Sequence, residues 1–200
     1  KSDVIHRYPV GNSKKFCDGK DLQPWKVKWS GRYIDYRKDE MYGPRYEELF
    51  VSPKVLVRSR TDGTSRLVVC ADLDKFYCDH TVVVLTEFDN IPNYRDHESY
   101  AGYNIHRGLD IDIFYIAAIL NSQVIADIFR NEYATGTLQN GYSDVYPKQL
   151  RDLPIPRPQI SSTVAEQIKD LSRKIHLDTG EVKQDAIDKL EILVSEMFAN

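Results

Sequence analysis

The sequence predicts an α+β fold, in which a mixed, twisted β-sheet packs around a central apolar helix and is followed by a C-terminal amphipathic helical appendage. Three observations predict it. Short β-branched runs lie between residues 54 and 85, an apolar segment follows at 110–131, and apolar residues recur every three or four positions after Pro158. The chain has 200 residues, 42% hydrophobic and 28% charged, as in ordinary globular proteins. We expect a globular domain over residues 1–158 and the helical appendage over 159–200.

Four segments predict strands because they are short, rich in β-branched or aromatic residues and bounded by turn residues: 33–36, 54–58, 67–71 and 81–85. Asp62 and Gly63, a strong turn pair, lie between the second and the third. The fourth segment is apolar without interruption, which predicts a strand that is buried on both faces. A short helical turn is expected at residues 47–50, before Pro53.

The helix over residues 110–131 is the central element of this prediction. Its apolar residues occur around most of its surface, which is typical of a helix in the middle of a domain. Asp110 or Asp112 can cap its N-terminus. A polar loop follows at 135–148. Residues 146–156 then predict a short extended element that two prolines close.

Two amphipathic helices are expected after Pro158. The sequence Ser161–Thr163 with Glu166 is a capping signature for the first, and Gly180 separates it from the second. Two such apolar faces can pair with each other, receive a partner helix or support self-association. The apolar positions that carry the periodicity are Val164, Ile168, Leu171, Ile175, Val182, Ala186, Leu190, Leu193 and Met197.

Composition and charge restrict the class of protein. Three cysteines without framework spacing favour a reduced, cytoplasmic protein, and no apolar run reaches the roughly 18 residues of a membrane helix. The net charge is −3, but residues 1–60 hold 14 Lys and Arg against 8 Asp and Glu. This asymmetry can place a basic face on an acidic body.

An ordered set of short segments resembles a known family. The segments are Gly19–Trp25, Pro53–Arg58, Ala71–Asp72, the helix that ends in Leu120-Asn121-Ser122, and Leu150–Pro156. In this order they resemble the C-terminal target-recognition domain of adenine-specific DNA methyltransferases, the TaqI-like specificity domain. They are also similar to the specificity subunits of type I restriction–modification systems.

The resemblance implies a non-catalytic module that recognises a double-stranded DNA sequence for an adenine-N6 methyltransferase of a restriction–modification or phage-defence system. Its partner would be the methyltransferase catalytic domain or subunit, and the parent enzyme would use S-adenosylmethionine. The chain contains neither an Asn/Asp-Pro-Pro-aromatic catalytic motif nor a glycine-containing cofactor loop. We therefore expect no cofactor and no catalytic residue in this chain.

Ten residues are candidates for DNA binding. Arg and Lys contact phosphates and guanine, whereas Asn and Gln pair with adenine. We expect a phosphate contact from Arg58 and a phosphate or base contact from Arg60 or Arg66, which flank the Asp62-Gly63 turn. The alternative is that these residues are ordinary solvated charges. The ten candidates are Lys14, Lys15, Lys20, Arg58, Arg60, Arg66, Gln139, Asn140, Tyr142 and Lys148.

Two functions of other classes stay open. A helical protein-interaction module without DNA affinity would explain the acidic balance and the C-terminal helices. A metal-dependent nuclease would use Asp72 and Asp74 as ligands of a divalent cation. A zinc site at Cys70, Cys78 and His80 is weak, because the sequence has no Cys-x-x-Cys pair.

Overall fold

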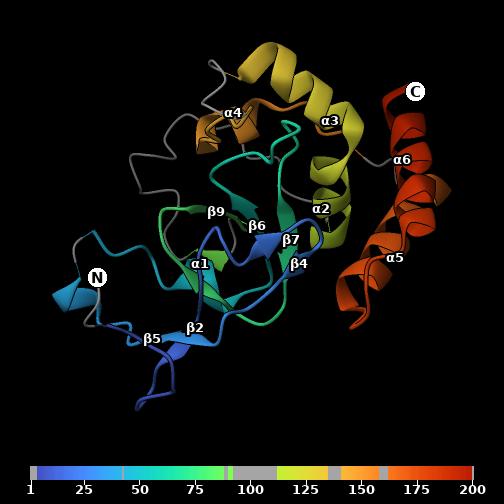
Figure 1. Cartoon of the computed structure of the whole chain (residues 1–200). Helices are drawn as coiled ribbons and strands as arrows, with labels where there is room; N and C mark the ends of the chain where they lie inside the picture. Colours follow the sequence, from blue (N-terminus) through green and yellow to red (C-terminus); the bar gives the residue numbers. More distant parts are fainter. Residues whose placement is uncertain are drawn as a thin grey trace.

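The computed structural model describes residues 4–41, 43–87, 90–91, 112–134, 141–157 and 162–199, and it confirms the α+β class (Figure 1). Its strands are β1 (Ile5–His6), β2 (Lys14–Cys17), β3 (Leu22–Gln23), β4 (Lys26–Val27), β5 (Arg32–Ile34), β6 (Lys54–Arg58), β7 (Val69–Asp72), β8 (Tyr77–Cys78) and β9 (Val82–Leu85). Its helices are η1 (Lys38–Glu40), α1 (Glu48–Val51), α2 (Ile113–Asn121), α3 (Gln123–Ile128), η5 (Phe129–Tyr133), α4 (Pro147–Asp152), α5 (Thr163–Leu177) and α6 (Gln184–Ala199). In this part of the chain the strands form three sheets and not the single expected one.

A three-stranded antiparallel sheet, ordered β7-β6-β9, lies at the centre of the molecule (Figure 1). The strand expected at 54–58 is confirmed as β6, and it is this middle strand that is buried on both faces. Side chains alternate along it, so that Val55 and Val57 join one hydrophobic core and Leu56 joins a second. The prediction that the strand at 81–85 is buried on both faces was wrong. β9 pairs with β6 along one side, and Val84 and Leu85 stay partly exposed.

The second core separates this sheet from a mixed four-stranded sheet, ordered β1-β5-β2-β8. Here β2 pairs antiparallel with β5 and parallel with β8. Phe16, Phe50 and Tyr77 fill this core, and the rings of Phe50 and Tyr77 stack with centroids 4.7 Å apart. The predicted helical turn at 47–50 is confirmed as α1, which supplies Phe50.

The central helix is divided where a single helix over 110–131 was expected. Asp112 caps α2 by accepting a hydrogen bond from the Phe114 amide at 2.7 Å, whereas Asp110 lies outside the described residues. The chain then bends by 56° between α2 and the α3–η5 segment. Asn121 donates its amide to the carbonyl of Val69, and Ser122 takes an extended conformation and caps α3. This bond to β7 ends the first helix.

α2 lies between the central sheet and the C-terminal helices, as Figure 1 shows. No single helix of the described residues is long and apolar enough to cross a membrane, although the bent pair of α2 with α3–η5 passes that test of length and composition together. The buried side chains of α2 are consistent with a core helix.

Residues 147–152 form the helix α4, and the extended element expected at 146–156 was wrong in its first half. Pro147 fixes φ in the helical range and has no N–H to leave unpaired, so it suits the first position of a helix. The backbone N–H of Tyr146 donates to Oε1 of Gln149 at 2.7 Å and stabilises this first turn.

The two C-terminal helices are confirmed as α5 and α6. Ser162 caps α5 by accepting from the Ala165 amide at 3.3 Å, near the predicted signature. Ile168 and Val194 are buried in the same core as the central sheet and α2. The boundary at residue 158 stays a prediction, but the helices share one hydrophobic core with the described part of residues 1–158.

Candidate nucleic-acid interface

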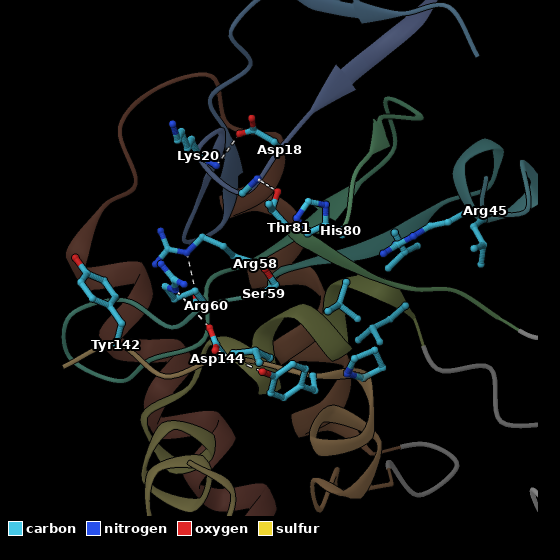
Figure 2. A pocket seen from close by; sticks show the side chains of 18 of the residues that line it. Asp18, Lys20, Arg45, Arg58, Ser59, Arg60, His80, Thr81, Tyr142 and Asp144 are labelled. Atoms are coloured by element: carbon cyan, nitrogen blue, oxygen red, sulfur yellow. Dashed lines mark hydrogen bonds and ion pairs between the residues drawn. The ribbon is translucent and has the colours of Figure 1, made fainter. Parts of the chain in front are cut away.

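An open groove of about 940 Å³ lies between the loop after β2, the start of β9 and the segments that follow β6 and precede α4 (Figure 2). Apolar side chains of β9, from Val83 to Leu85, line its floor. Its rim carries four Lys and Arg residues and two aspartates. The charged and polar residues that line it are Asp18, Lys20, Arg45, Tyr46, Arg58, Ser59, Arg60, His80, Thr81, Tyr142, Asp144 and Tyr146.

One wall of the groove is a short two-stranded antiparallel ribbon, formed by residues 59–61 and 143–145. The Thr61 amide donates to the carbonyl of Ser143 at 2.9 Å, and the Val145 amide donates to the carbonyl of Ser59 at 3.0 Å. Between these two bonds Arg60 is paired with Asp144. The ribbon thus joins two parts of the chain that each contain candidate DNA-binding residues, Arg58 and Arg60 in one and Tyr142 in the other.

The hairpin after β6 turns through an aspartate, and its positive φ falls on a serine. Oδ1 of Asp62 accepts from the amides of Thr64 at 2.8 Å and Arg66 at 2.9 Å. Ser65 adopts φ +66°, whereas Gly63 has no positive φ. Gly141 is required where the ribbon crosses the hairpin, because it has φ +77° and an added Cβ would lie 3.1 Å from the carbonyl oxygen of Gly63.

Arg58 holds the backbone of the ribbon through two side-chain hydrogen bonds. Its Nε donates to the carbonyl of Arg60 at 2.8 Å and its Nη2 to the carbonyl of Thr61 at 2.7 Å. Burial lowers the pKa of the guanidinium, which remains charged at any ordinary pH. Two of its donors are therefore engaged with the backbone of the segment that carries Arg60, and its expected phosphate contact stays a prediction.

Arg60 is the more exposed of the two arginines on this wall, with 57% of its side chain accessible. Its Nε lies 3.5 Å from Oδ1 of Asp144, and the hydroxyl of Tyr146 lies 3.4 Å from the second carboxylate oxygen. Figure 2 shows Arg60 and Asp144 side by side on the ribbon.

The opposite wall is the Asp18–Lys20 loop, which is fastened to the start of β9. The Gly19 amide donates to Oγ1 of Thr81 at 2.8 Å, and a Cβ on Gly19 would lie 3.0 Å from the Thr81 carbonyl and 3.2 Å from Cγ of Arg58. Only glycine fits such a close approach without a shift. The contact holds the exposed Lys20 at the rim of the groove.

Asp18 contributes less negative charge to the groove than its position suggests. Burial would raise the pKa of Asp18, but hydrogen bonds from Arg32 and from the backbone N–H of Lys20 lower it below its ordinary value. The Arg32 guanidinium lies 2.9 Å from Asp18 and also pairs with Asp21, so it offsets part of the charge of this carboxylate. With four basic residues against two acids, the rim is positive on balance.

The ten sequence candidates divide between the groove and other places. Lys20, Arg58, Arg60 and Tyr142 line the groove together. Arg66 does not belong to it, since its guanidinium binds Gln123 and Glu191 on the side of α3 and α6. Gln139 and Asn140 lie outside the described residues.

The remaining three candidates are lysines that do not line the groove. Lys14 and Lys15 belong to β2, and Nζ of Lys15 forms an ion pair with Asp74 at 2.8 Å. Lys148 is exposed on α4, one residue beyond Pro147, which lines the groove. Whether any of these residues touches DNA stays a prediction.

Several groove residues were not among the sequence candidates: Arg45, His80, Thr81, Asp144 and Tyr146. In residues 142–146 burial alternates, because Ser143 and Val145 are buried and their neighbours are not. The sequence Tyr-Ser-Asp-Val-Tyr does not alternate between apolar and polar residues, so the sequence of this segment does not predict the strand. Arg45 enters the groove from a distant segment and donates to the Val82 carbonyl at 3.3 Å.

The residues proposed for metal binding have other partners. Asp72 is buried in an ion pair with Lys54, and it accepts from the amides of Asp74 and Phe76. Burial raises the pKa of the Cys78 thiol to about 12. In the described ranges no three His, Cys, Asp or Glu side chains gather as a metal site.

Comparison with known proteins identifies the family of this chain. No curated protein sequence matches the chain. A family model does match, over residues 14–155, and this range includes both walls of the groove. The matching model is the TaqI-like C-terminal specificity domain, and the chain belongs to this family.

Proposed function

We propose that this chain selects a double-stranded DNA sequence for an adenine-N6 methyltransferase of a restriction–modification or phage-defence system. A TaqI-like specificity domain implies DNA target recognition in methyltransferase-related proteins. The observation that supports the groove as the binding site is that Lys20, Arg58, Arg60 and Tyr142, from three separate segments, line it together. The chain supplies recognition, and a catalytic domain or subunit in the same cytoplasm supplies the S-adenosylmethionine chemistry.

The two walls suit two parts of a duplex. A two-stranded ribbon fits the width of the major groove, where base edges are accessible. The ribbon of residues 59–61 and 143–145 carries an exposed arginine for this purpose. Lys20 on the opposite wall is placed for a phosphate, whose contacts position the protein without reading the sequence.

The experiment is a fluorescence-anisotropy titration of the full chain against a pool of duplexes over a series of salt concentrations, with and without its catalytic partner. We expect the logarithm of the association constant to fall linearly with the logarithm of the salt concentration. Lys20→Ala should weaken binding to all sequences and reduce the slope by about one. Lys189→Ala, which removes an exposed lysine of α6, is the matched control and should leave both unchanged. No binding to any duplex under either condition would refute the proposal.

We also propose self-association through the C-terminal helices. The apolar faces of α5 and α6 are used within the chain, where Ile168, Leu190 and Val194 are buried. Ile192 is exposed on α6 and is the residue through which a second copy would bind. Light scattering on the full chain tests this proposal. A dimer that Ile192→Lys disrupts would support it, and a monomer at all protein concentrations would refute it.

A further inference from the structure

We propose that Arg60 reads a guanine in the major groove and that Asp144 positions its guanidinium for this contact. The inference rests on the proposed function and deepens it, because it names one base of the recognised site and the residue that selects it. It depends on which arginine has free donors, on the register of the ribbon and on the charge beside Arg60.

Of the three arginines that line the groove, Arg60 is the one in which neither Nη atom has a partner among the described residues. Arg58 donates to two backbone carbonyls, Arg66 is held by Gln123 and Glu191, and Arg45 donates to a carbonyl of β9. Within the described residues, neither Nη atom of Arg60 has a hydrogen-bond or ion-pair partner; its one polar contact is through Nε. An exposed guanidinium with both terminal nitrogens unpaired can still make a bidentate contact.

The register of the ribbon places Asp144 where it can orient this side chain. The bonds from Thr61 to Ser143 and from Val145 to Ser59 flank the pair, so Arg60 and Asp144 are a non-hydrogen-bonded pair. In such pairs the side chains lie closest together on one face. The carboxylate contacts Nε and forms no hydrogen bond with either Nη atom, while Tyr146 contacts the other carboxylate oxygen.

The chemistry favours a guanine over the other partners of arginine. Guanine presents two acceptors in the major groove, O6 and N7, whereas adenine presents one acceptor and one donor. A guanidinium has no acceptor, so it matches the first pattern and not the second. A phosphate also accepts two bonds, but it would bring a second anion close to the Asp144 carboxylate, which lies 3.5 Å from Nε. A neutral base edge adds no such repulsion.

The test begins with selection of the preferred site of the unchanged protein from a randomised duplex pool. Affinities are then measured over a salt series for that site and for duplexes in which each G·C pair is replaced. We expect Arg60→Ala to lose roughly 5- to 150-fold in affinity for the selected site, the equivalent of 1–3 kcal/mol. At one G·C pair this variant should no longer discriminate, and its salt slope should stay unchanged. Replacing that guanine by 7-deazaguanine, which lacks the N7 acceptor, should weaken DNA binding by the unchanged protein but not by the Arg60→Ala variant.

Two further variants test the planar, two-pronged shape of the guanidinium separately from its charge, and test its positioning by Asp144. Arg60→Lys keeps the charge without the fork and should discriminate less strongly at the same pair. Asp144→Asn should relax the guanine preference while leaving binding to replaced duplexes equal or stronger, because it removes a negative charge. Circular dichroism confirms that each variant is folded, as expected for exposed side chains.

The outcomes distinguish the two proposals. If the unchanged protein binds no duplex, the proposed function fails. The function survives and the inference fails if the selected site contains no guanine, or if Arg60→Ala weakens all duplexes equally with a slope lower by about one, the result of a phosphate contact. Full discrimination by Asp144→Asn would remove the positioning role of Asp144.

Discussion

Acidification should loosen the attachment of α5 through a single buried imidazole, His176. Its ring meets the rings of Trp25 and Phe114 edge to face, with centroids 5.5 and 5.6 Å apart. Nδ1 bonds to the carbonyl of Ser172 at 2.8 Å, which makes it the protonated nitrogen. Nε2 is buried and has no hydrogen-bond partner in the described structure. A second proton would therefore place an uncompensated charge among aromatic rings.

The size and sign of the effect follow from the pKa. Burial, and to a smaller extent the charge of Lys26, lower the pKa of His176 from 6.5 to about 4, although the bond to Ser172 acts in the opposite direction. The unfolded chain takes up its proton near pH 6.5 and the folded chain only near pH 4. Stability is therefore constant for this residue above pH 6.5 and is lost as the pH falls toward 4. At 1.36 kcal/mol per pH unit the loss reaches about 3 kcal/mol.

Urea unfolding at intervals from pH 7.5 to 4 measures this loss, with His176→Gln as the comparison. The carboxylates titrate in both proteins, so the difference between the two free energies of unfolding isolates the histidine. We expect that difference to be flat above pH 6.5 and to shift in favour of the variant by up to about 3 kcal/mol at pH 4. Two parallel curves across the whole range would show that Nε2 is solvated and that the reasoning is wrong.

Three further predictions concern the scaffold, and urea unfolding measures all of them. Gly19→Val should cost about 1–3 kcal/mol through overpacking and should also weaken DNA binding, so unchanged stability and affinity would contradict the close approach. Asp72→Asn should destabilise the fold by about 3–5 kcal/mol because Lys54, which is fully buried, would lose its counter-charge, whereas changing both to apolar residues should recover most of the loss. Leu190→Asp should cost several kcal/mol, whereas Leu177→Asp at an exposed position should be nearly neutral; equal effects would place the core elsewhere.

Elements whose signals lie within one segment were predictable from the sequence. β6 is short and β-branched, and α5 and α6 repeat their apolar residues with helical spacing, so local preference and burial agree. The central helix shows where local signals end. The run of apolar residues correctly stops at Asn121, but the bend there depends on a bond to Val69, which is 52 residues away in the sequence. No pattern within the helix records that partner.

The segment before α4 was misread for a different reason. Tyr146 precedes a proline and is extended, with φ −107° and ψ 152°, as the sequence predicted. The error was to continue this conformation through Pro147, because proline is as suitable for the first turn of a helix as for an extended element. The side chain of Gln149 decides between the two by bonding back to the Tyr146 amide.

The candidate site was predictable as a set of residue types but not as a selection among them. Three arginines flank the same turn, and nothing in their local sequence distinguishes Arg60 from Arg66. The difference comes from Gln123 and Glu191, which are 57 and 125 residues away from Arg66 in the sequence and engage its guanidinium. Long-range partners thus decide which arginine stays free.

The same long-range contacts explain how an exposed arginine can be selective. Ordering a flexible side chain and its loop on binding costs free energy, which lowers affinity and blurs the difference between bases. Here the hairpin is held on one side by the contact of Arg66 with Glu191 and on the other by the hydrogen bond from Thr61 to Ser143. Arg58 also donates a hydrogen bond to the backbone carbonyl of Thr61. Arg60 therefore projects from a segment that is held before DNA arrives, with Asp144 beside it. When an arginine projects from a rigid segment, little free energy is spent on ordering it, and an Arg–guanine contact can then discriminate between base pairs.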